Sequence, residues 1–290
     1  MANLKEVKNR ISSVISTQQI TKAMKMVAAA KLRKAQDSIL QMRPYAQKLS
    51  EVLENVSGGL EAGQNAFSGN RDENNILIVV ISSDRGLCGP FNTNVFKAAV
   101  QLIKDKYESQ LNAGDLQVLT IGKKSTEFFK KRKYKVIDEF SDIFSHLSFS
   151  RARAAANYIM QGYTEEKFDK VEIVYNEFKN VATQILNSEQ FLPIKEPGEE
   201  GVSLDNDYIF QPNQEVLINE IVPKSLKVQF YKAILESNAS EHGARMTAMD
   251  KATENADDIL RDLKLTYNQT RQAAITKEIL EIVAGAEALG

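Results

Sequence analysis

The chain has 290 residues, 43% of them hydrophobic, so it can bury a core and is not a disordered protein. Its 37 basic and 38 acidic residues leave a formal charge of -1, so no global field draws it to nucleic acid or anionic lipid. One cysteine, Cys88, and two histidines exclude an internal disulfide and the usual zinc site. No stretch approaches the roughly 20 apolar residues that cross a bilayer.

A long helix is the first element that the sequence predicts. Steps of three and four residues select Leu4, Val7, Ile11, Val14, Gln18, Thr21, Lys25, Ala28, Leu32, Ala35, Ile39, Met42, Ala46, Leu49, Leu53 and Val56. Thirteen of these sixteen positions are apolar, a seam typical of a coiled coil. The polar residues Gln18, Thr21 and Lys25 are either tolerated seam positions or a place where another protein meets the helix. Pro44 should kink the helix without ending it.

The middle of the chain predicts an α/β domain after a Gly/Asn-rich link at 57–75. The expected order is a strand at 76–82, a helix at about 91–111, a strand at 116–121, a helix at 125–132, a strand at 134–137, a helix at 151–163, and paired strands at 170–178 and 182–194. Alternating strands and helices indicate a mainly parallel sheet, with an antiparallel edge where the last two strands meet. An acidic surface segment follows this pair.

The C-terminal part predicts a second long helix, because no proline occurs from Lys224 to Gly290. Its first seam is Val228, Tyr231, Leu235, Asn238, His242, Arg245, Met249, Ala252, Ala256, Ile259 and Leu263. The phase then shifts, and the seam continues through Ile275, Ile279, Ile282, Ala286 and Leu289. At about 1.5 Å per residue this helix reaches on the order of 100 Å, too long to lie inside one compact domain.

Charge favours an antiparallel pairing of the two long helices. The segment from Val7 to Gln36 has seven basic residues and no acidic one, whereas Glu236 to Asp262 has seven acidic and three basic residues. We therefore expect an antiparallel coiled-coil shaft from 1–57 and 213–290, an α/β domain at 75–192, and a surface linker at 193–212. The basic N-terminal segment also resembles a transit peptide, but its seam argues against cleavage.

No enzymatic motif is complete. The turn after the first strand has Gly86 and Gly89 spaced G-x-x-G, one glycine short of the dinucleotide fingerprint. The segment TIGKKST lacks the earlier P-loop glycine before Gly122 and a hydroxyl directly after the lysine. Cys88 lacks the spacing of a nucleophile elbow, so we expect a buried thiol. We predict no catalytic residue, cofactor or metal.

Three segments together point to a family. TKAMKMVAAAKLRKAQ, SSDRGLCGPFN and ARMTAMDKATENADDILRDLKLTYNQTRQAAITKEILEIVAGAEAL closely resemble the gamma subunit of the rotary ATP synthase. The resemblance implies a non-catalytic rotor stalk that carries torque between a membrane ring of c subunits and a catalytic ring of three alpha and three beta subunits. It also implies an epsilon subunit as a partner, and no nucleic acid. The acidic segment around 195–207 is longer than the family minimum.

The resemblance also implies contact residues. Met24, in TKAMKMV, is similar to a family methionine that faces a beta-subunit loop, and Arg245, in ARMTAM, lies in the partner helix. The set that couples rotation to catalysis corresponds to Arg271, Gln272, Thr276 and Glu278, in TRQAAITKE. Met24 could instead be ordinary coiled-coil packing, and the polar four a solvated face. The absence of a transit peptide favours a peripheral location on the cytoplasmic face of a bacterial plasma membrane.

Two other functions stay open at this level. The first is an enzyme whose α/β domain binds a small ligand and whose coiled coil makes a dimer. The second is a scaffold or tether that forms a homodimer without catalytic partners. Nucleotide binding by the chain alone would favour the first, and copurification with catalytic subunits would exclude both.

Overall fold

The computed structural model describes residues 4–57, 67, 71–194 and 214–287, with only the backbone at 50–57 and 214–219. The chain divides into two compact units, residues 29–245, and residues 1–28 together with 246–290. The two long helices, α1 (Leu4–Ser57) and α6 (Gln214–Glu287), contribute to both units. Across the described ranges no helix is both long and apolar enough to cross a membrane.

A five-stranded sheet organises the unit formed by residues 29–245. Its strands are β1 (Ile76–Ile81), β2 (Leu116–Ile121), β3 (Lys135–Ile137), β4 (Lys170–Phe178) and β5 (Gln184–Leu192). They lie in the order β3-β2-β1-β4-β5, and only β5 is antiparallel to its neighbour. The predicted parallel sheet with one antiparallel edge is confirmed.

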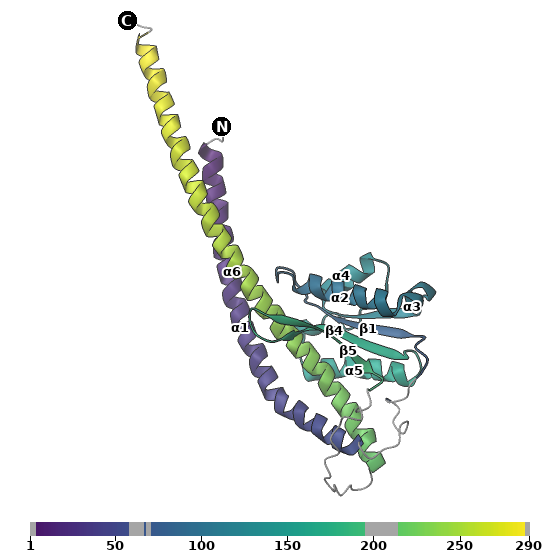
Figure 1. Cartoon of the computed structure of the whole chain (residues 1–290). Helices are drawn as coiled ribbons and strands as arrows, with labels where there is room; N and C mark the ends of the chain where they lie inside the picture. The colour runs from purple at the N-terminus through teal and green to yellow at the C-terminus, as the bar shows by residue number, and fades with distance from the viewer. Residues whose placement is uncertain (1–3, 58–66, 68–70, 195–213, 288–290) are drawn as a thin grey trace. The chain divides into compact units, whose positions relative to one another are not determined.

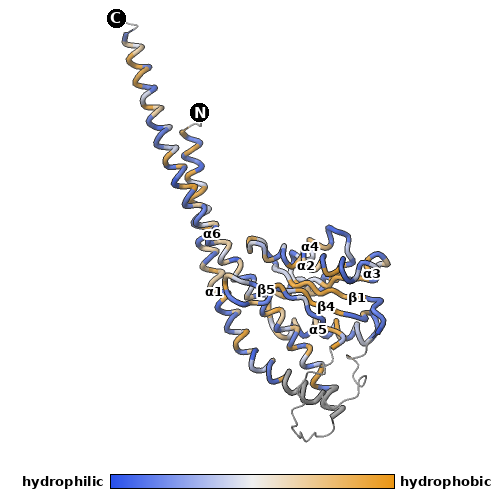
Figure 2. Tube along the Cα trace, in the orientation of Figure 1, coloured by the Kyte–Doolittle hydropathy of each residue, from blue (hydrophilic) through white to orange (hydrophobic). Residues whose placement is uncertain are grey.

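Helices cover both faces of this sheet (Figure 1). The helices α2 (Phe91–Lys106) and α4 (Lys123–Lys131) pack on one face, and α5 (Phe149–Thr164) and the first part of α6 pack on the other. All six residues of β1 are buried, which explains why its sequence, ILIVVI, is apolar without alternation. Figure 2 shows the resulting hydrophobic centre along β1 and β4.

The helix predicted at 91–111 is wrong in one respect, because it breaks at Tyr107. That residue leaves the helical conformation, with φ of -130° and ψ of 26°, and α3 (Glu108–Ala113) follows it. The Tyr107 ring is buried, and its hydroxyl donates a hydrogen bond to the buried carboxylate of Glu172 on β4. The break therefore coincides with a contact between the end of α2 and the sheet. A 3-10 turn at Ile143–His146 was also not predicted.

In the other unit, α1 and α6 lie side by side and antiparallel (Figure 1). Val7, Thr21 and Ala28 are buried in the α1 seam, and the other seam positions of this unit are half-buried. The seam of α1 is therefore confirmed as far as its side chains are described, and it continues past residue 28 with buried Leu32 and Ala35. The side chains of Leu53 and Val56 lie outside the described residues. The helix also continues through its internal proline, as predicted.

The predicted seam of α6 is wrong by one position. Ile259 is 50% exposed, whereas Leu260 is 7% exposed, because from Met249 the helix contacts α1 in steps of four and then three residues. The later seam is also wrong for this chain. Ile275, Ile279 and Ile282 are 48%, 55% and 71% exposed. Leu289 lies outside the described residues, and the predicted domain limits at 57, 75, 192 and 213 stay predictions.

Candidate partner-contact surfaces

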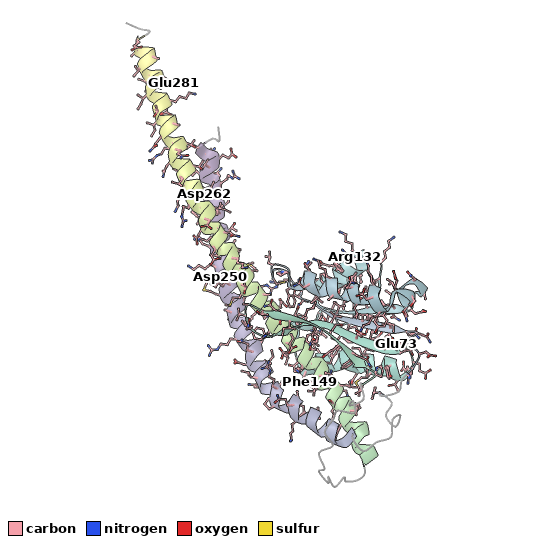
Figure 3. All side chains as sticks on the ribbon, in the orientation of Figure 1. Glu73, Arg132, Phe149, Asp250, Asp262 and Glu281 are labelled. Carbon is pink, nitrogen blue, oxygen red and sulfur yellow. The ribbon has the colours of Figure 1, made fainter. Side chains whose placement is uncertain are left out.

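The three polar residues that interrupt the α1 seam form a ladder of contacts with α6. Gln18 donates a hydrogen bond to Asp257, and Lys25 forms an ion pair with Asp250, which Figure 3 labels on α6. Between them the hydroxyls of Thr21 and Thr253 are 2.8 Å apart. These contacts satisfy the polar seam residues within the chain. They also fix the axial register of the two helices, since every rung joins one residue pair.

This register leaves the end of α6 without a partner on α1. The step from Lys25 to Gln18 matches the step from Asp250 to Asp257, so Leu4, the first described residue of α1, lies opposite residue 271 or so. From there α6 continues to Glu287 as a single helix. The described part of α1 therefore cannot cover the predicted late seam, which explains its exposure.

Four of the six predicted contact residues lie on this single-helix end. Arg271, Gln272, Thr276 and Glu278 are all exposed. None of them forms a hydrogen bond or ion pair with another described residue. Gln272 and Thr276 are one turn apart, and Arg271 and Glu278 are two turns apart, so each pair forms a row on one side of the helix. Both rows are free to meet another molecule.

An exposed apolar row runs between these two polar rows. Ile275, Ile279 and Ile282 have the i, i+4, i+7 spacing of one helix face. A single helix in water gains nothing from such a face, and exposed apolar rows of this kind are typical of surfaces that bind another protein. The sequence had already singled out these isoleucines, but as a seam within the chain. The structure assigns them to the outer surface.

Met24 lies in the unit formed by residues 1–28 and 246–290, beside Lys25 of the polar ladder, and is half-buried. Two apolar neighbours outside the predicted contact set are more exposed, Met26 at 63% and Val27 at 56%. Both lie off the α1 seam, and that offset is the signal that could have identified them. Ile20, also off the seam, is 59% exposed. The role of Met24 in a partner contact stays a prediction.

The sixth predicted contact residue, Arg245, lies in the unit formed by residues 29–245. Its guanidinium donates hydrogen bonds to the backbone carbonyls of Arg85 at 3.0 Å and Gly86 at 3.2 Å. It also forms an ion pair with Glu241, and the two side chains are only 11% and 8% exposed. Arg245 thus holds the turn after β1 against α6, whatever further contact it makes. The turn presents Leu87, which is 66% exposed with φ of 63°.

The chemistry of this turn argues against catalysis. Cys88 is 1% exposed, as predicted, and burial raises the pKa of its thiol, so the nucleophilic thiolate is disfavoured. Burial, with Arg245 and Lys31 contributing, lowers the pKa of His242 to about 4. A general base with that pKa is too weak at neutral pH. Among the described residues no cluster of metal-ligating side chains occurs.

In the second candidate phosphate loop, TIGKKST, the backbone N–H groups at the helix start are already hydrogen-bonded within the chain. The backbone N–H of Lys123 donates to the Asp84 carboxylate, that of Lys124 to the Ser83 carbonyl, and that of Ser125 to the Ser82 hydroxyl. A phosphate cradle needs such N–H groups free at the helix start. Here these three are used to join the β2–α4 turn to the end of β1, so this turn cannot hold a nucleotide.

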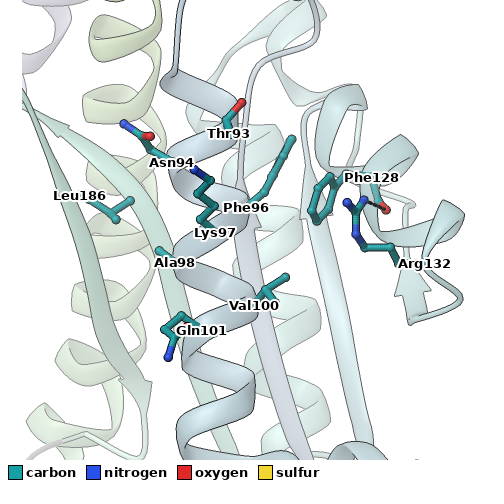
Figure 4. A pocket seen from close by; sticks show the side chains of 10 residues that line it. All are labelled: Thr93, Asn94, Phe96, Lys97, Ala98, Val100, Gln101, Phe128, Arg132 and Leu186. Atoms are coloured by element: carbon teal, nitrogen blue, oxygen red, sulfur yellow. Dashed lines mark hydrogen bonds between the residues drawn. The ribbon is translucent and has the colours of Figure 1, made fainter.

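A hollow of about 750 Å³ on the outer side of α2 has few groups for chemistry. Figure 4 shows Leu186 on one side of α2, and Phe128 with Arg132 on the other. The Phe96 and Phe128 rings stack at 4.4 Å, and the Arg132 guanidinium lies 3.6 Å from the Phe128 ring centre. Within the described ranges, no carboxylate, histidine or cysteine lines this hollow. It offers an apolar surface rather than an active site.

Comparison with known proteins gives one consistent family. The ATP synthase family model matches residues 3–289. The chain is 58% identical to the ATP synthase gamma chain of Cytophaga hutchinsonii and 52% identical to that of Christiangramia forsetii. Each alignment covers 100% of this chain and 99% of the relative.

Solved structures agree on the fold. A chain from the mitochondrial ATP synthase of Euglena gracilis, in an assembly of OSCP, F1 and c-ring, has a TM-score of 0.67 at 21% identity, covering 99% of this chain and 94% of that one. A chain from the central stalk and c-ring of the Tetrahymena thermophila enzyme has a TM-score of 0.56 at 24% identity, covering 80% and 99%. On the sequence matches, this chain belongs to the ATP synthase gamma chain family.

Proposed function

We propose that this chain is the central rotor stalk of a proton-translocating ATP synthase. It carries torque between the membrane ring of c subunits and the catalytic ring of three alpha and three beta subunits, with the epsilon subunit as a further partner. The chain makes and breaks no bond of ATP itself. It acts by setting the conformations of the catalytic sites on its neighbours.

The register between α1 and α6 carries this proposal. An axle must resist sliding and twisting of one strand past the other, and the contacts of Gln18, Thr21 and Lys25 with α6 oppose both motions. The identity of 58% along the full length of a gamma chain supports the same role. Nothing in this arrangement needs a cofactor.

The mechanism follows from asymmetry. A single helix with polar rows and an apolar row presents a different surface at each angle, so three identical neighbours around it would meet three different surfaces. Each angle then favours one conformation at each catalytic site through its differential contacts. Rotation driven by the membrane ring would shift these populations in turn, and ATP hydrolysis would drive the helix in reverse.

The contact residues belong to this proposal. Arg271, Gln272, Thr276 and Glu278 are exposed at or beyond the level of Leu4, the first described residue of α1, which supports a role in meeting the catalytic ring. Met24 would meet a beta-subunit loop lower on the shaft. Arg245 would contribute by holding the Leu87 turn in place, and by any contact that its exposed edge makes.

Gamma chains are peripheral parts of a membrane-bound complex. We place this one on the cytoplasmic face of a bacterial plasma membrane, and the bacterial relatives at 58% and 52% identity support that location.

Affinity purification of a tagged copy from native membranes tests the function. We expect three alpha and three beta subunits to copurify with each copy of this chain, together with ATPase activity. A homodimer without these subunits would contradict the proposal and favour the tether. Tight nucleotide binding by the purified chain alone, measured by calorimetry, would favour the ligand-binding enzyme.

A further inference from the structure

A groove of about 690 Å³ lies within the unit formed by residues 29–245, among α1, α5 and α6. The residues that α1 contributes, from Ser38 to Tyr45, have the i, i+3, i+4, i+7 spacing of one helix face. Those of α6, from Lys224 to Tyr231, have the same spacing, and α5 adds Phe149 and Arg153. The volume falls within the range of small-molecule sites, so the groove is large enough for a ligand.

The floor of the groove is apolar and partly uncovered. Phe149, labelled in Figure 3, and Tyr231 pack edge to face with ring centres 5.4 Å apart. Met42 and Val228 extend this surface. Phe149 remains 41% exposed and Tyr45 57% exposed, so aromatic rings that could bury an apolar chain are left in water.

The polar lining carries positive charge only. Arg153, Lys224 and Lys227 line the groove, and none of the described aspartates or glutamates does. Lys224 forms a 3.2 Å ion pair with exposed Glu220, but neither Arg153 nor Lys227 has a carboxylate partner among the described residues. In a chain with a net charge of -1 this is a local concentration of cations. It makes the groove a site for an anion.

We propose that this groove binds an anionic phospholipid. The Arg153 guanidinium can donate two parallel hydrogen bonds to phosphate oxygens, and the two lysines add charge without demanding a fixed geometry. The apolar chain of the lipid covers the aromatic floor. α5 begins at Phe149, so the positive end of a 16-residue helix adds to the attraction.

A lipid fits this lining better than an acidic segment of a protein. A bound peptide brings backbone N–H and C=O groups that need partners, and besides the cations and the Tyr45 and Tyr231 hydroxyls the lining offers only Ser38 and Gln41. A phospholipid concentrates its polar atoms in one headgroup and leaves the rest apolar. The proposal stands apart from the rotor function, because it concerns the chain by itself.

Sedimentation of the full-length chain with lipid vesicles tests the proposal. We expect the chain to bind phosphatidylcholine vesicles that contain phosphatidylglycerol, and not vesicles of phosphatidylcholine alone. The double variant Arg153→Gln/Lys227→Gln should lower the partition coefficient roughly 30-fold, since each cation near an anionic surface contributes about 1 kcal/mol, or roughly fivefold. Circular dichroism should show an unchanged fold.

The double variant Arg33→Gln/Lys34→Gln is the matched control, because it removes the same two charges from exposed positions on α1 outside the groove. We expect it to lower binding by less than about threefold. An equal loss in both double variants would mean diffuse attraction to the surface, and would overturn the proposal.

The variant Tyr45→Ser distinguishes binding of a whole phospholipid from binding of a simple anion. It removes an apolar wall without changing charge, and should lower vesicle binding about fivefold. Unchanged binding, or full displacement of the vesicles by inorganic phosphate at low concentration, would overturn the lipid assignment. Binding of polyglutamate with no binding of anionic vesicles would also overturn it, in favour of an acidic protein segment.

Discussion

Arg245 is held in a nearly buried pair with Glu241, one turn earlier on α6. Burial raises the pKa of the Glu241 carboxyl, and the neighbouring guanidinium opposes that shift. Removing one member of such a pair leaves the other charge buried without compensation, which costs more than the pair contributes. The carbonyls of Arg85 and Gly86 would lose their donor as well.

We expect Arg245→Ala to lower the free energy of unfolding by about 3 kcal/mol or more, because Glu241 is then left as a buried unpaired carboxylate. Urea denaturation of the full chain measures this change. The double variant Glu241→Leu/Arg245→Met should recover at least half of the loss. If the double variant is as unstable as the single one, the uncompensated charge is not the cause.

The shifted pKa of His242 should make the free energy of unfolding depend on pH. Its pKa in the folded chain is about 4, mainly because it is buried, against about 6.5 in an unfolded chain. The unfolded state therefore takes up the proton first as pH falls, so stability is lost between about pH 6.5 and pH 4, by about 3 kcal/mol in all. The His242→Gln variant should lack this loss.

Unfolding of both proteins measured across that pH range isolates the histidine. Glu241 titrates with a raised pKa in both proteins, and its opposite contribution should largely cancel in the difference. Parallel stability curves for the two proteins would show that His242 is not protonated on unfolding, against this account.

At the scale of elements, the β2–α4 turn depends on one glycine. Gly122 has φ of 96°, and a Cβ there would lie 2.2 Å from the carbonyl oxygen of Ser82. We expect Gly122→Ala to destabilise the chain by about 2 kcal/mol or more. Gly86→Ala is the control, because a Cβ at Gly86 meets nothing within 4 Å. Similar thermal midpoints for both variants would contradict this view of the turn.

Substitutions of exposed residues at the end of α6 should lower the activity of the complex without unfolding the chain. Arg271→Ala or Gln272→Ala removes an exposed side chain, so circular dichroism of the chain should not change. In the assembled complex each lost contact worth about 1 kcal/mol should lower ATP turnover roughly fivefold. Arg261→Ala, an exposed arginine on the same helix, serves as control. Normal turnover in the Arg271 and Gln272 variants would remove both from the contact surface.

At the scale of the whole molecule, torque requires that the paired helices turn as one body. The hydroxyls of Thr21 and Thr253 are close enough that cysteines at these two positions should form a disulfide between α1 and α6. We expect Thr21→Cys/Thr253→Cys, once oxidised, to leave the turnover of the complex within about twofold of the reduced form. Cys88 is buried and should not compete. A loss that reduction restores would mean that the helices slide during turnover.

Much of the fold could be predicted because its signals are local. The α1 seam, the unbroken apolar run of β1 and the alternation of strands and helices all follow from the spacing of apolar residues along short stretches. The exposed polar residues of the α6 end were found through motif resemblance rather than through spacing. Their surroundings could not be predicted, since exposure depends on where the partner helix begins.

The sequence by itself determined where the strands and the main helices form, that the two long helices pair antiparallel, and that no nucleotide motif is complete. The tertiary structure decided the register, which buries Leu260 instead of Ile259, the break at Tyr107, and the contacts of Arg245 with a turn 160 residues away. Periodicity is a property of neighbouring residues, whereas these choices depend on which distant side chains meet. Only packing the chain brings those side chains together.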